Sequence, residues 1–349
     1  METKLDIRQL SLEQLITQIA DLGEKKFRAR QIYEWLWKKR ATDFNQMTNL
    51  TKSLRETLKE HFIINEILLQ EAQKSKDKTI KNTFLLADSS VIEGVLIPTK
   101  KRMTACVSVQ VGCSLDCAFC ATGKLKKVRN LNADEIFDQV VMINEQSNKE
   151  FNIPLSNIVF MGMGEPLLNY KNVISSIEKI SSSYGLGMSA KRITVSTAGI
   201  AKMIKKLGDD NVRFNLALSL HAANDVKRNK IMPINESNNL DSLKESMIYF
   251  TEKTGQRPTL EYIIFKDFND ALSDAEELYQ FGSAFPSKVN IIEYNSIDDK
   301  KYQQADPKKV AAFASYLESK KVIVNIRRSR GKDIDAACGQ LANKNILTF

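Results

Sequence analysis

Hydrophobic side chains recur at helical spacing over the first 65 residues. Three amphipathic helices are predicted there, with apolar positions at Leu12, Leu15, Ile16 and Ile19, then at Ile32, Tyr33, Leu36 and Trp37, and then at Leu54, Leu58 and Phe62. Ser11 with Gln14 three residues later forms a capping box that begins the first helix, and Gly23 is placed to end it. The pattern predicts a small helical domain over residues 1–65, with the aromatic and apolar stripe in its core.

Between residues 66 and 103 the hydrophobic period changes to two residues. The segments 79–86 and 91–97 have the pattern of two strands, which predicts a short antiparallel β-hairpin that introduces the main domain. Glu93 is an acid within the otherwise apolar second strand. Such a residue ordinarily faces solvent on an edge strand.

From residue 104 onward, short apolar runs alternate with amphipathic segments. Strands are predicted at 106–110 and near 157–162, 192–196, 213–219, 260–265, 288–293 and 322–326. Asn132 with Glu135 forms a capping box that begins one of the helices between them. Six or seven parallel βαβ units are too few for a closed eight-stranded barrel. The fold class is therefore α/β, with an open, TIM-like partial barrel of the (β/α)6 type over residues 104–335 and a C-terminal loop over 336–349.

The positive charge of the chain is concentrated in two runs. Residues 100–129 and 320–332 each carry a net charge of +6, although the whole chain carries only +9. Two separate basic runs that lie beside the cysteines favour a polyanionic substrate such as RNA over an ordinary solvated face. The sequence has no segment typical of a signal peptide and no apolar run long enough to span a membrane, so a cytoplasmic protein is expected.

The five cysteines point to chemistry rather than to disulfide bridges. Cys113, Cys117 and Cys120 have CxxxCxxC spacing, close enough for one loop to direct three thiolates at a single inorganic centre. A structural zinc site takes four ligands, and so does a closed iron–sulfur cluster. Three ligands leave one iron free to bind S-adenosylmethionine (SAM). Zinc, or a structural cluster completed by a distant fourth ligand, is the alternative.

Polar residues follow several of the predicted strands directly. They are Gly164 and Glu165, Ser196 and Thr197, the segment Ser219, Leu220 and His221, and Asn295. In barrels of this kind the reactive groups lie at the carboxyl ends of the strands. Each residue alone could be a helix cap, but together they predict a ring suited to the charged methionine end and the ribose of SAM.

These motifs carry a family resemblance. The CxxxCxxC loop with Phe119 before its last cysteine resembles the signature of radical SAM enzymes. The runs 105–113, 162–167 and 333–340 narrow the resemblance to the RlmN family, which methylates C2 of adenine in 23S rRNA and tRNA. The similarity extends from about Glu93 to Leu341, and its motifs are specific in combination.

The resemblance implies a set of site residues. The metal ligands would be Cys113, Cys117 and Cys120, holding one [4Fe-4S] cluster per subunit. The SAM-binding residues would be Gly164, Glu165, Ser196, Ser219, Leu220, His221 and Asn295, and the catalytic residues would be Glu93, Cys338 and Cys106. Without the resemblance, Cys106 and Cys338 would be taken for small buried hydrophobic residues. Cys338, however, follows a basic run, and nearby cations favour a thiolate.

The resemblance also implies an activity and partners. One SAM would methylate Cys338, and a radical derived from a second would activate the S-methyl group for addition to adenine C2. Glu93 or a bound water would remove the proton, and Cys106 would release the product as a disulfide forms. The targets would be an adenosine at the peptidyl transferase centre of 23S rRNA and the adenosine 3′ to the anticodon in some tRNAs. The expected partners are these RNAs and a one-electron donor such as flavodoxin with its reductase, and the protein is expected to be a monomer.

Three alternatives stay open at the level of sequence. A relative that methylates C8 of adenine and confers antibiotic resistance differs in the segment around Pro166, which here has the C2 pattern. A radical enzyme acting on a non-RNA substrate, such as a glycyl-radical activator, would need neither Cys106, nor Cys338, nor the basic runs. A zinc-dependent RNA-binding module without catalytic activity would contain no iron or sulfide.

Overall fold

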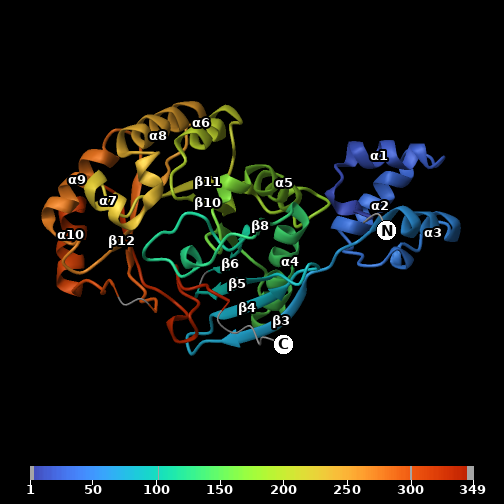
Figure 1. Cartoon of the computed structure of the whole chain (residues 1–349), viewed down its shortest axis with the longest axis horizontal. Helices are drawn as coiled ribbons and strands as arrows, with labels where there is room; N and C mark the ends of the chain where they lie inside the picture. Colours follow the sequence, from blue (N-terminus) through green and yellow to red (C-terminus); the bar gives the residue numbers. More distant parts are fainter. Residues whose placement is uncertain (1–3, 101, 299–300, 344–349) are drawn as a thin grey trace.

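The computed structural model describes residues 4–100, 102–298 and 301–343. Its centre is a ten-stranded sheet in the order β14-β13-β12-β11-β10-β9-β6-β5-β4-β3 (Figure 1). Seven neighbouring strands are parallel, namely β6 (Met103–Cys106), β9 (Asn157–Phe160), β10 (Ile193–Thr197), β11 (Asn215–Ser219), β12 (Thr259–Ile264), β13 (Lys288–Glu293) and β14 (Val324–Arg327). The predicted parallel strands are thereby confirmed. The strand predicted at 106–110 ends earlier, at Cys106.

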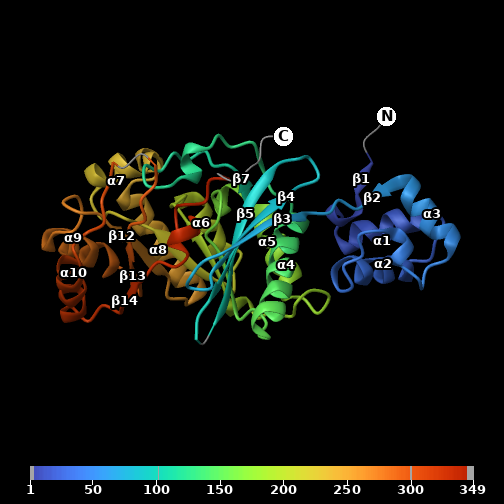
Figure 2. The same cartoon turned by 90° about the horizontal axis from the view of Figure 1, so that it is seen from below.

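Helices connect the parallel strands, and most of them lie along the outer side of the curved sheet (Figures 1 and 2). They are α4 (Ala133–Phe151), α5 (Tyr170–Ser181), α6 (Ala201–Asp209), α7 (Asp225–Ile231), α8 (Leu240–Thr254), α9 (Leu272–Gly282) and α10 (Pro307–Ser319). Asn132 and Glu135 form the predicted capping box at the start of α4. The edge strands β14 and β3 do not pair with each other, so the barrel is open and partial, as predicted.

Three antiparallel strands extend the sheet beyond β6. They are β3 (Leu68–Lys74), β4 (Ile80–Leu85) and β5 (Val91–Pro98), and β5 pairs with β6. The predicted hairpin is β4–β5, whereas β3 was missed because this edge strand is mostly exposed and polar. Glu93 lies on β5, inside the sheet, and only 1% of its surface is exposed. The interpretation of Glu93 as a solvent-facing edge residue is therefore wrong.

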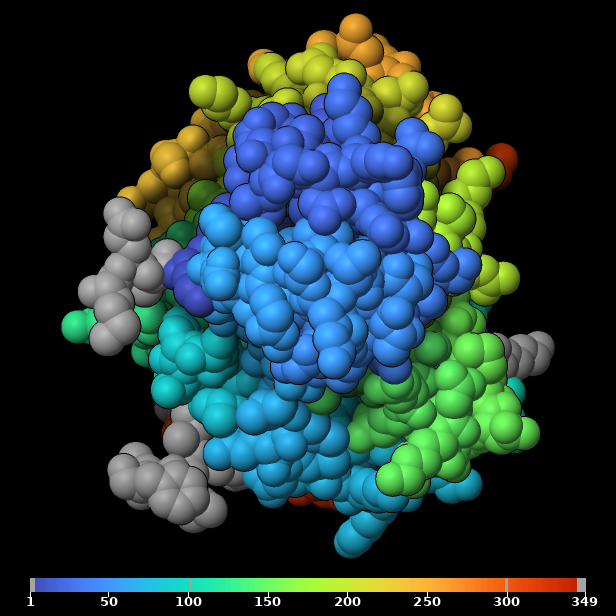
Figure 3. Space-filling view, turned by 90° about the vertical axis from the view of Figure 1, so that its right-hand side faces the viewer, coloured from blue at the N-terminus to red at the C-terminus, as the bar shows by residue number. Residues whose placement is uncertain are grey.

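The N-terminal helices form a separate lobe at one end of the molecule (Figures 1 and 2), and Figure 3 looks onto that end. They are α1 (Leu12–Asp21), α2 (Phe27–Trp37) and α3 (Lys52–His61), and a short parallel pair joins β1 (Leu5–Asp6) to β2 (Phe62–Ile63). Ser11 and Gln14 make the predicted capping box. Phe62 is not part of the third helix, because α3 ends at His61 and Phe62 begins β2.

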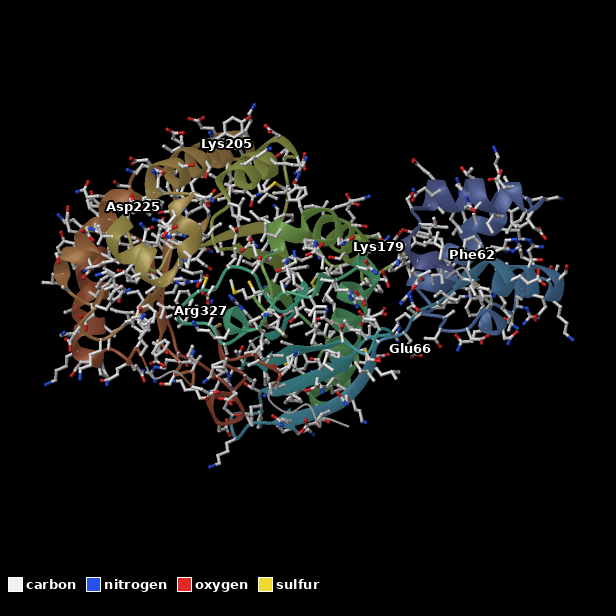
Figure 4. The ribbon with its side chains drawn as sticks, viewed as in Figure 1. Phe62, Glu66, Lys179, Lys205, Asp225 and Arg327 are labelled. Atoms are coloured by element: carbon white, nitrogen blue, oxygen red, sulfur yellow. The ribbon has the colours of Figure 1, made fainter. Side chains whose placement is uncertain are left out.

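A buried polar and aromatic junction fastens this lobe to the barrel. Arg8 pairs with Asp134 at 3.3 Å and with Asp138 at 2.7 Å, both on α4. Lys179 of α5 lies over the ring of Trp37 at 4.1 Å, and Figure 4 shows it at the boundary with the N-terminal helices. The contacts fix the lobe against α4 and α5.

The domain boundaries at 65/66, 103/104 and 335/336 stay predictions. Residues 344–349 of the predicted C-terminal loop lie outside the described residues. Within the described ranges, none of the helices is both long and apolar enough to cross a membrane.

Candidate active site

The loop that carries the three cysteines connects two short antiparallel strands, β7 (Gln110–Val111) and β8 (Arg129–Asn130). Because these strands pair with each other, the loop begins and ends at the same place. Gly112 has a φ of +74°, and a Cβ there would collide with the carbonyl of Lys126. Only glycine therefore allows the two arms of the loop to approach so closely.

The three cysteines line one cavity of about 150 Å³. Burial raises the pKa of Cys113 to about 11 and also raises the pKa values of Cys117 and Cys120. The thiols are therefore protonated on their own, and metal binding would displace the protons. Three cysteines that line one cavity suit a cubane cluster, in which each thiolate binds a different iron.

Side chains from three strand ends meet in the same cavity. The hydroxyls of Ser196 and Ser219 lie 3.2 Å apart, at the ends of β10 and β11. Glu165 accepts hydrogen bonds from the backbone N–H groups of Leu167 at 3.0 Å and Ala198 at 2.8 Å. Burial nevertheless raises the pKa of its carboxyl group. Most of the polar groups predicted from the strand ends therefore line one cavity.

The two glycines before Glu165 are required because neighbouring residues leave no space for a side chain. A Cβ on Gly162 would lie 2.7 Å from the backbone of Val107. Gly164 has a φ of +94°, and a Cβ there would overlap the side chain of Gln110, whose Oε1 accepts the N–H of Glu165 at 2.9 Å. The close approach that these glycines permit is therefore to the neighbouring strand, and it presents Glu165 to the cavity.

His221 lines the cavity as a buried neutral ring. Its Nδ1 lies 3.0 Å from the N–H of Ile263 and accepts its hydrogen bond, which leaves the ring proton on Nε2. Phe119 packs edge-on against it, with the ring centroids 4.7 Å apart. Burial, and then the charge of Arg228, lowers the pKa of His221 to about 3. A ring in this state can donate a hydrogen bond to a ligand but is a poor general base.

Two predicted SAM-binding residues do not line the cavity. Leu220 is fully buried in the main hydrophobic core, and its N–H bonds the carbonyl of Glu261 at 3.0 Å. Asn295 donates a hydrogen bond to the carbonyl of Cys338 at 3.2 Å, while its buried Oδ1 has no hydrogen-bond partner within the described part of the chain. Asn295 can thus hold the loop of Cys338 and still accept a hydrogen bond from a ligand.

A second cavity of about 330 Å³ adjoins the first. Cys120 and Cys338 line both cavities, whereas Cys106 lines only the second. All five thiols are free, so Cys106 and Cys338 are close but not bonded to each other. Burial, and then the neighbouring Cys338, raises the pKa of Cys106 to about 12. Cys338 therefore occupies the boundary between the cysteine-lined cavity and a second, more basic one.

The basic character of the second cavity comes from four arginines, Arg102, Arg327, Arg328 and Arg330. Arg327 pairs with Glu261 at 3.2 Å, and Arg330 pairs with Asp77 at 3.6 Å. Lys332 and Lys320 also pair with acids, at 2.9 Å and 4.0 Å. Most basic residues of the run at 320–332 are thus paired with acidic residues of the same protein. Arg328 is exposed at the rim of the second cavity. Figure 4 shows Arg327 within the barrel, well away from the N-terminal lobe.

Glu93 lines neither cavity. Its Oε1 lies 3.5 Å from Nζ of Lys81, and both residues are buried. Its Oε2 accepts the backbone N–H groups of Ala342 at 2.9 Å and Asn343 at 3.2 Å. The segment that follows Cys338 therefore covers the carboxylate.

Sequence patterns missed several residues that support the site. Lys81 lies in a strand with polar neighbours, Gln110 lies in a two-residue strand, and Arg228 lies among other charged residues on a short helix. No local signal identifies them, because only the fold shows that their side chains are buried beside the site.

The comparisons with known proteins agree with this geometry. The family described as "Radical SAM superfamily" matches residues 107–281, and "Ribosomal RNA large subunit methyltransferase N-terminal domain" matches residues 5–64. The crystal structure of a radical SAM methyltransferase from Sphaerobacter thermophilus is 35% identical, with a TM-score of 0.90 over 97% of this chain and 99% of that chain. The protein is therefore a radical SAM enzyme, and this family implies a [4Fe-4S] cluster and SAM.

The particular family follows from the curated relatives. Proteins named "Probable dual-specificity RNA methyltransferase RlmN" from Cytophaga hutchinsonii and Christiangramia forsetii are 57% and 56% identical to this chain. They cover 97% and 99% of it, with 93% and 98% of their own lengths. A relative of the same name from Caldanaerobacter subterraneus subsp. tengcongensis is 40% identical over 97% of the chain and 98% of its own length. The chain belongs to the RlmN family of radical SAM methyltransferases, as the sequence motifs predicted.

Proposed function

We propose that this enzyme methylates C2 of an adenosine at the peptidyl transferase centre of 23S rRNA and of the adenosine 3′ to the anticodon in some tRNAs. The observation that carries the proposal is the position of Cys338 between two adjoining cavities. One cavity has the donor set for a cluster and SAM, and the other has the arginines that suit an RNA nucleotide. A carbon bound to the Cys338 sulfur can reach both.

The cysteine-lined cavity holds the cofactors in this proposal. Cys113, Cys117 and Cys120 bind the cluster, which supplies one electron for reductive cleavage of SAM when both are bound. Glu165 receives the ammonium group of SAM. Ser196, Ser219, His221 and Asn295 offer hydrogen bonds to its remaining polar groups, Gly164 shapes the wall, and Leu220 supports the loop from the core.

Cys338 and Cys106 divide the work on the methyl group. The Cys338 thiolate attacks the methyl carbon of a first SAM, and S-adenosylhomocysteine leaves. Adenine C2 cannot make this attack because it is electron-poor. After a second SAM has been consumed to remove a hydrogen atom from that methyl, the carbon would join C2, and the adduct would give up the C2 proton and one electron, for which the oxidised cluster is an acceptor. Cys106 then attacks the Cys338 sulfur, the carbon–sulfur bond breaks as a disulfide forms, and the released carbon takes up a proton to become the methyl group. Reduction of the disulfide by an external thiol restores both cysteines.

Glu93 is the proposed acceptor for the C2 proton. Two backbone N–H groups, of Ala342 and Asn343, donate to its carboxylate, and Nζ of Lys81 lies 3.5 Å from its other oxygen. The segment at Ala342 and Asn343 must shift, or a water must relay the proton, before the carboxylate serves the second cavity.

Nucleoside analysis tests the proposal. Digested rRNA and tRNA from a strain lacking this gene should contain no 2-methyladenosine, and the wild-type gene should restore it where Cys338→Ala does not. Persistence of 2-methyladenosine in both RNAs would refute the proposed function. Loss of 8-methyladenosine instead would favour the C8 alternative.

A further inference from the structure

Arg228 of α7 is a charged side chain with no exposed surface. Arginine is almost never fully buried unless an acid pairs with it. Within the ranges that the structure describes, Arg228 forms no ion pair. Its Nη1 bonds Oδ1 of Asn235 at 2.6 Å, and the amide of Asn235 separates it from Asp225. The positive charge is therefore buried without a countercharge in direct contact.

The guanidinium group ties together the two strand ends of the cofactor cavity. It donates to the carbonyls of Ala198 at 2.6 Å, of Ser219 at 3.3 Å and of Leu220 at 3.1 Å. Ala198 follows β10, and Ser219 ends β11. The planar fork therefore fixes the spacing of the two strands whose serines line the cavity.

The same helix also supports the cysteine loop. The carbonyl of Ile231, at the end of α7, accepts the N–H of Ala118 at 2.9 Å. Ala118 directly follows Cys117 in the sequence. Ala198, whose carbonyl accepts a hydrogen bond from Arg228, lines the same cavity as Cys117. The guanidinium therefore lies directly behind the wall of the cavity that this loop faces.

We propose that Arg228 is a positioning residue that also sets the reduction potential of the cluster. A cluster with three thiolate ligands is anionic, and reduction adds one more negative charge. A buried positive charge behind the loop stabilises the reduced state more than the oxidised state, because the low-dielectric interior screens it weakly. Arg228 thereby makes the cluster easier to reduce, while its fork holds the strand ends in place for SAM.

The test compares Arg228→Gln, which removes the positive charge, with Arg228→Lys. The lysine keeps the charge but cannot donate to all three carbonyls in the geometry of a guanidinium group. Lys230→Gln removes an exposed charge from the same helix and is the matched control. Each anaerobically reconstituted protein is analysed for iron and titrated by electron paramagnetic resonance to obtain the midpoint potential. SAM affinity is measured by equilibrium dialysis with the oxidised cluster, without RNA.

Arg228→Gln should have a more negative midpoint potential than the wild type, whereas Arg228→Lys and Lys230→Gln should remain close to the wild type. Both Arg228 variants should bind SAM about tenfold more weakly, since buried bonds from a charged donor are lost. Loading of iron by Arg228→Lys but not by Arg228→Gln would also support the role of the charge. Equal potentials in the wild type and Arg228→Gln, or loss of iron from Arg228→Lys too, would overturn it.

The inference rests on the proposed cluster site but not on the proposed RNA targets. A wild-type protein that binds no cluster would contradict the proposed function itself. A wild-type cluster whose potential is insensitive to Arg228 would contradict only this inference.

Discussion

The backbone N–H of Ala121 donates a 2.7 Å hydrogen bond to the carbonyl of Gly339. Thr122 donates a second one, from its hydroxyl to the carbonyl of Leu341, at 2.6 Å. Gly339 has a φ of +83°, which glycine tolerates best, so the close fit depends on this residue. The loop that carries Cys338 is thus fastened directly to the loop that carries the cluster cysteines, although the two are more than 200 residues apart in sequence.

Replacing any one of Cys113, Cys117 or Cys120 with Ala should prevent cluster assembly, because two thiolates rarely hold a cubane. Iron and acid-labile sulfide after anaerobic reconstitution measure the effect. Cys106→Ala is the matched control and should load like the wild type. A full complement of iron and sulfide in one of the three variants would show that its cysteine is not a ligand.

Arg328 lies at the rim of the second cavity, whereas Lys321 is exposed but lies away from it. Comparing variants of the two residues tests whether position at the rim matters for RNA binding. Arg328→Gln should weaken RNA binding and reduce the slope of log K against log salt by about 0.7–0.9, the value for one phosphate contact. Lys321→Gln removes an exposed charge from the same run, away from the cavity, and should change little. Filter binding over a salt series measures both slopes. Identical slopes for Arg328→Gln and the wild type would exclude a phosphate contact by Arg328.

The low pKa of His221 makes folding stability depend on pH. The unfolded chain binds a proton near pH 6.5, but the folded chain does so only near pH 3, because burial and then Arg228 disfavour the charged ring. Stability should therefore be full above pH 6.5 and fall by up to about 1.4 kcal/mol per pH unit as the pH drops towards 3. Thermal unfolding of His221→Gln should show a shallower fall than the wild type. The exposed His61→Gln is the control, and equal slopes for His221→Gln and the wild type would contradict the assignment.

Arg8 should be essential for docking the N-terminal lobe. Arg8→Gln leaves Asp134 and Asp138 without their buried partner, which costs about 3–5 kcal/mol. Arg40 pairs with Glu145 across the same junction, but this pair is largely exposed. Arg40→Gln should therefore cost at most about 1 kcal/mol. Chemical denaturation measures the difference, and equal losses in the two variants would argue against the buried network.

Local pattern was sufficient for the strands and helices of the barrel. Buried parallel strands such as β11 have an apolar run, here over residues 216–218, and the start of α4 has a capping box. β3 has neither signal, because it lies at an exposed edge and is held mainly by pairing with β4. β3 is a strand because it pairs with β4, and its own composition does not indicate one.

The site was only partly predictable for a similar reason. The spacing of three cysteines in one loop is a local fact, so the cluster loop could be inferred directly. The partners of Glu93 and Arg228 depend on which segments the fold brings together. The charge of the run at 320–332 was visible, but its internal pairing, as in Arg327 with Glu261, depends on side chains from other strands.

The most direct test of the central claim is the fate of Cys106→Ala with RNA. If Cys338 transfers the carbon and Cys106 only releases it, Cys106→Ala should accept a methyl, react and stall as a covalent protein–RNA complex. A denaturing gel should then show a nuclease-sensitive band of raised mass, which the Cys106→Ala/Cys338→Ala double variant should lose. An unshifted Cys106→Ala protein that still makes 2-methyladenosine would contradict the account.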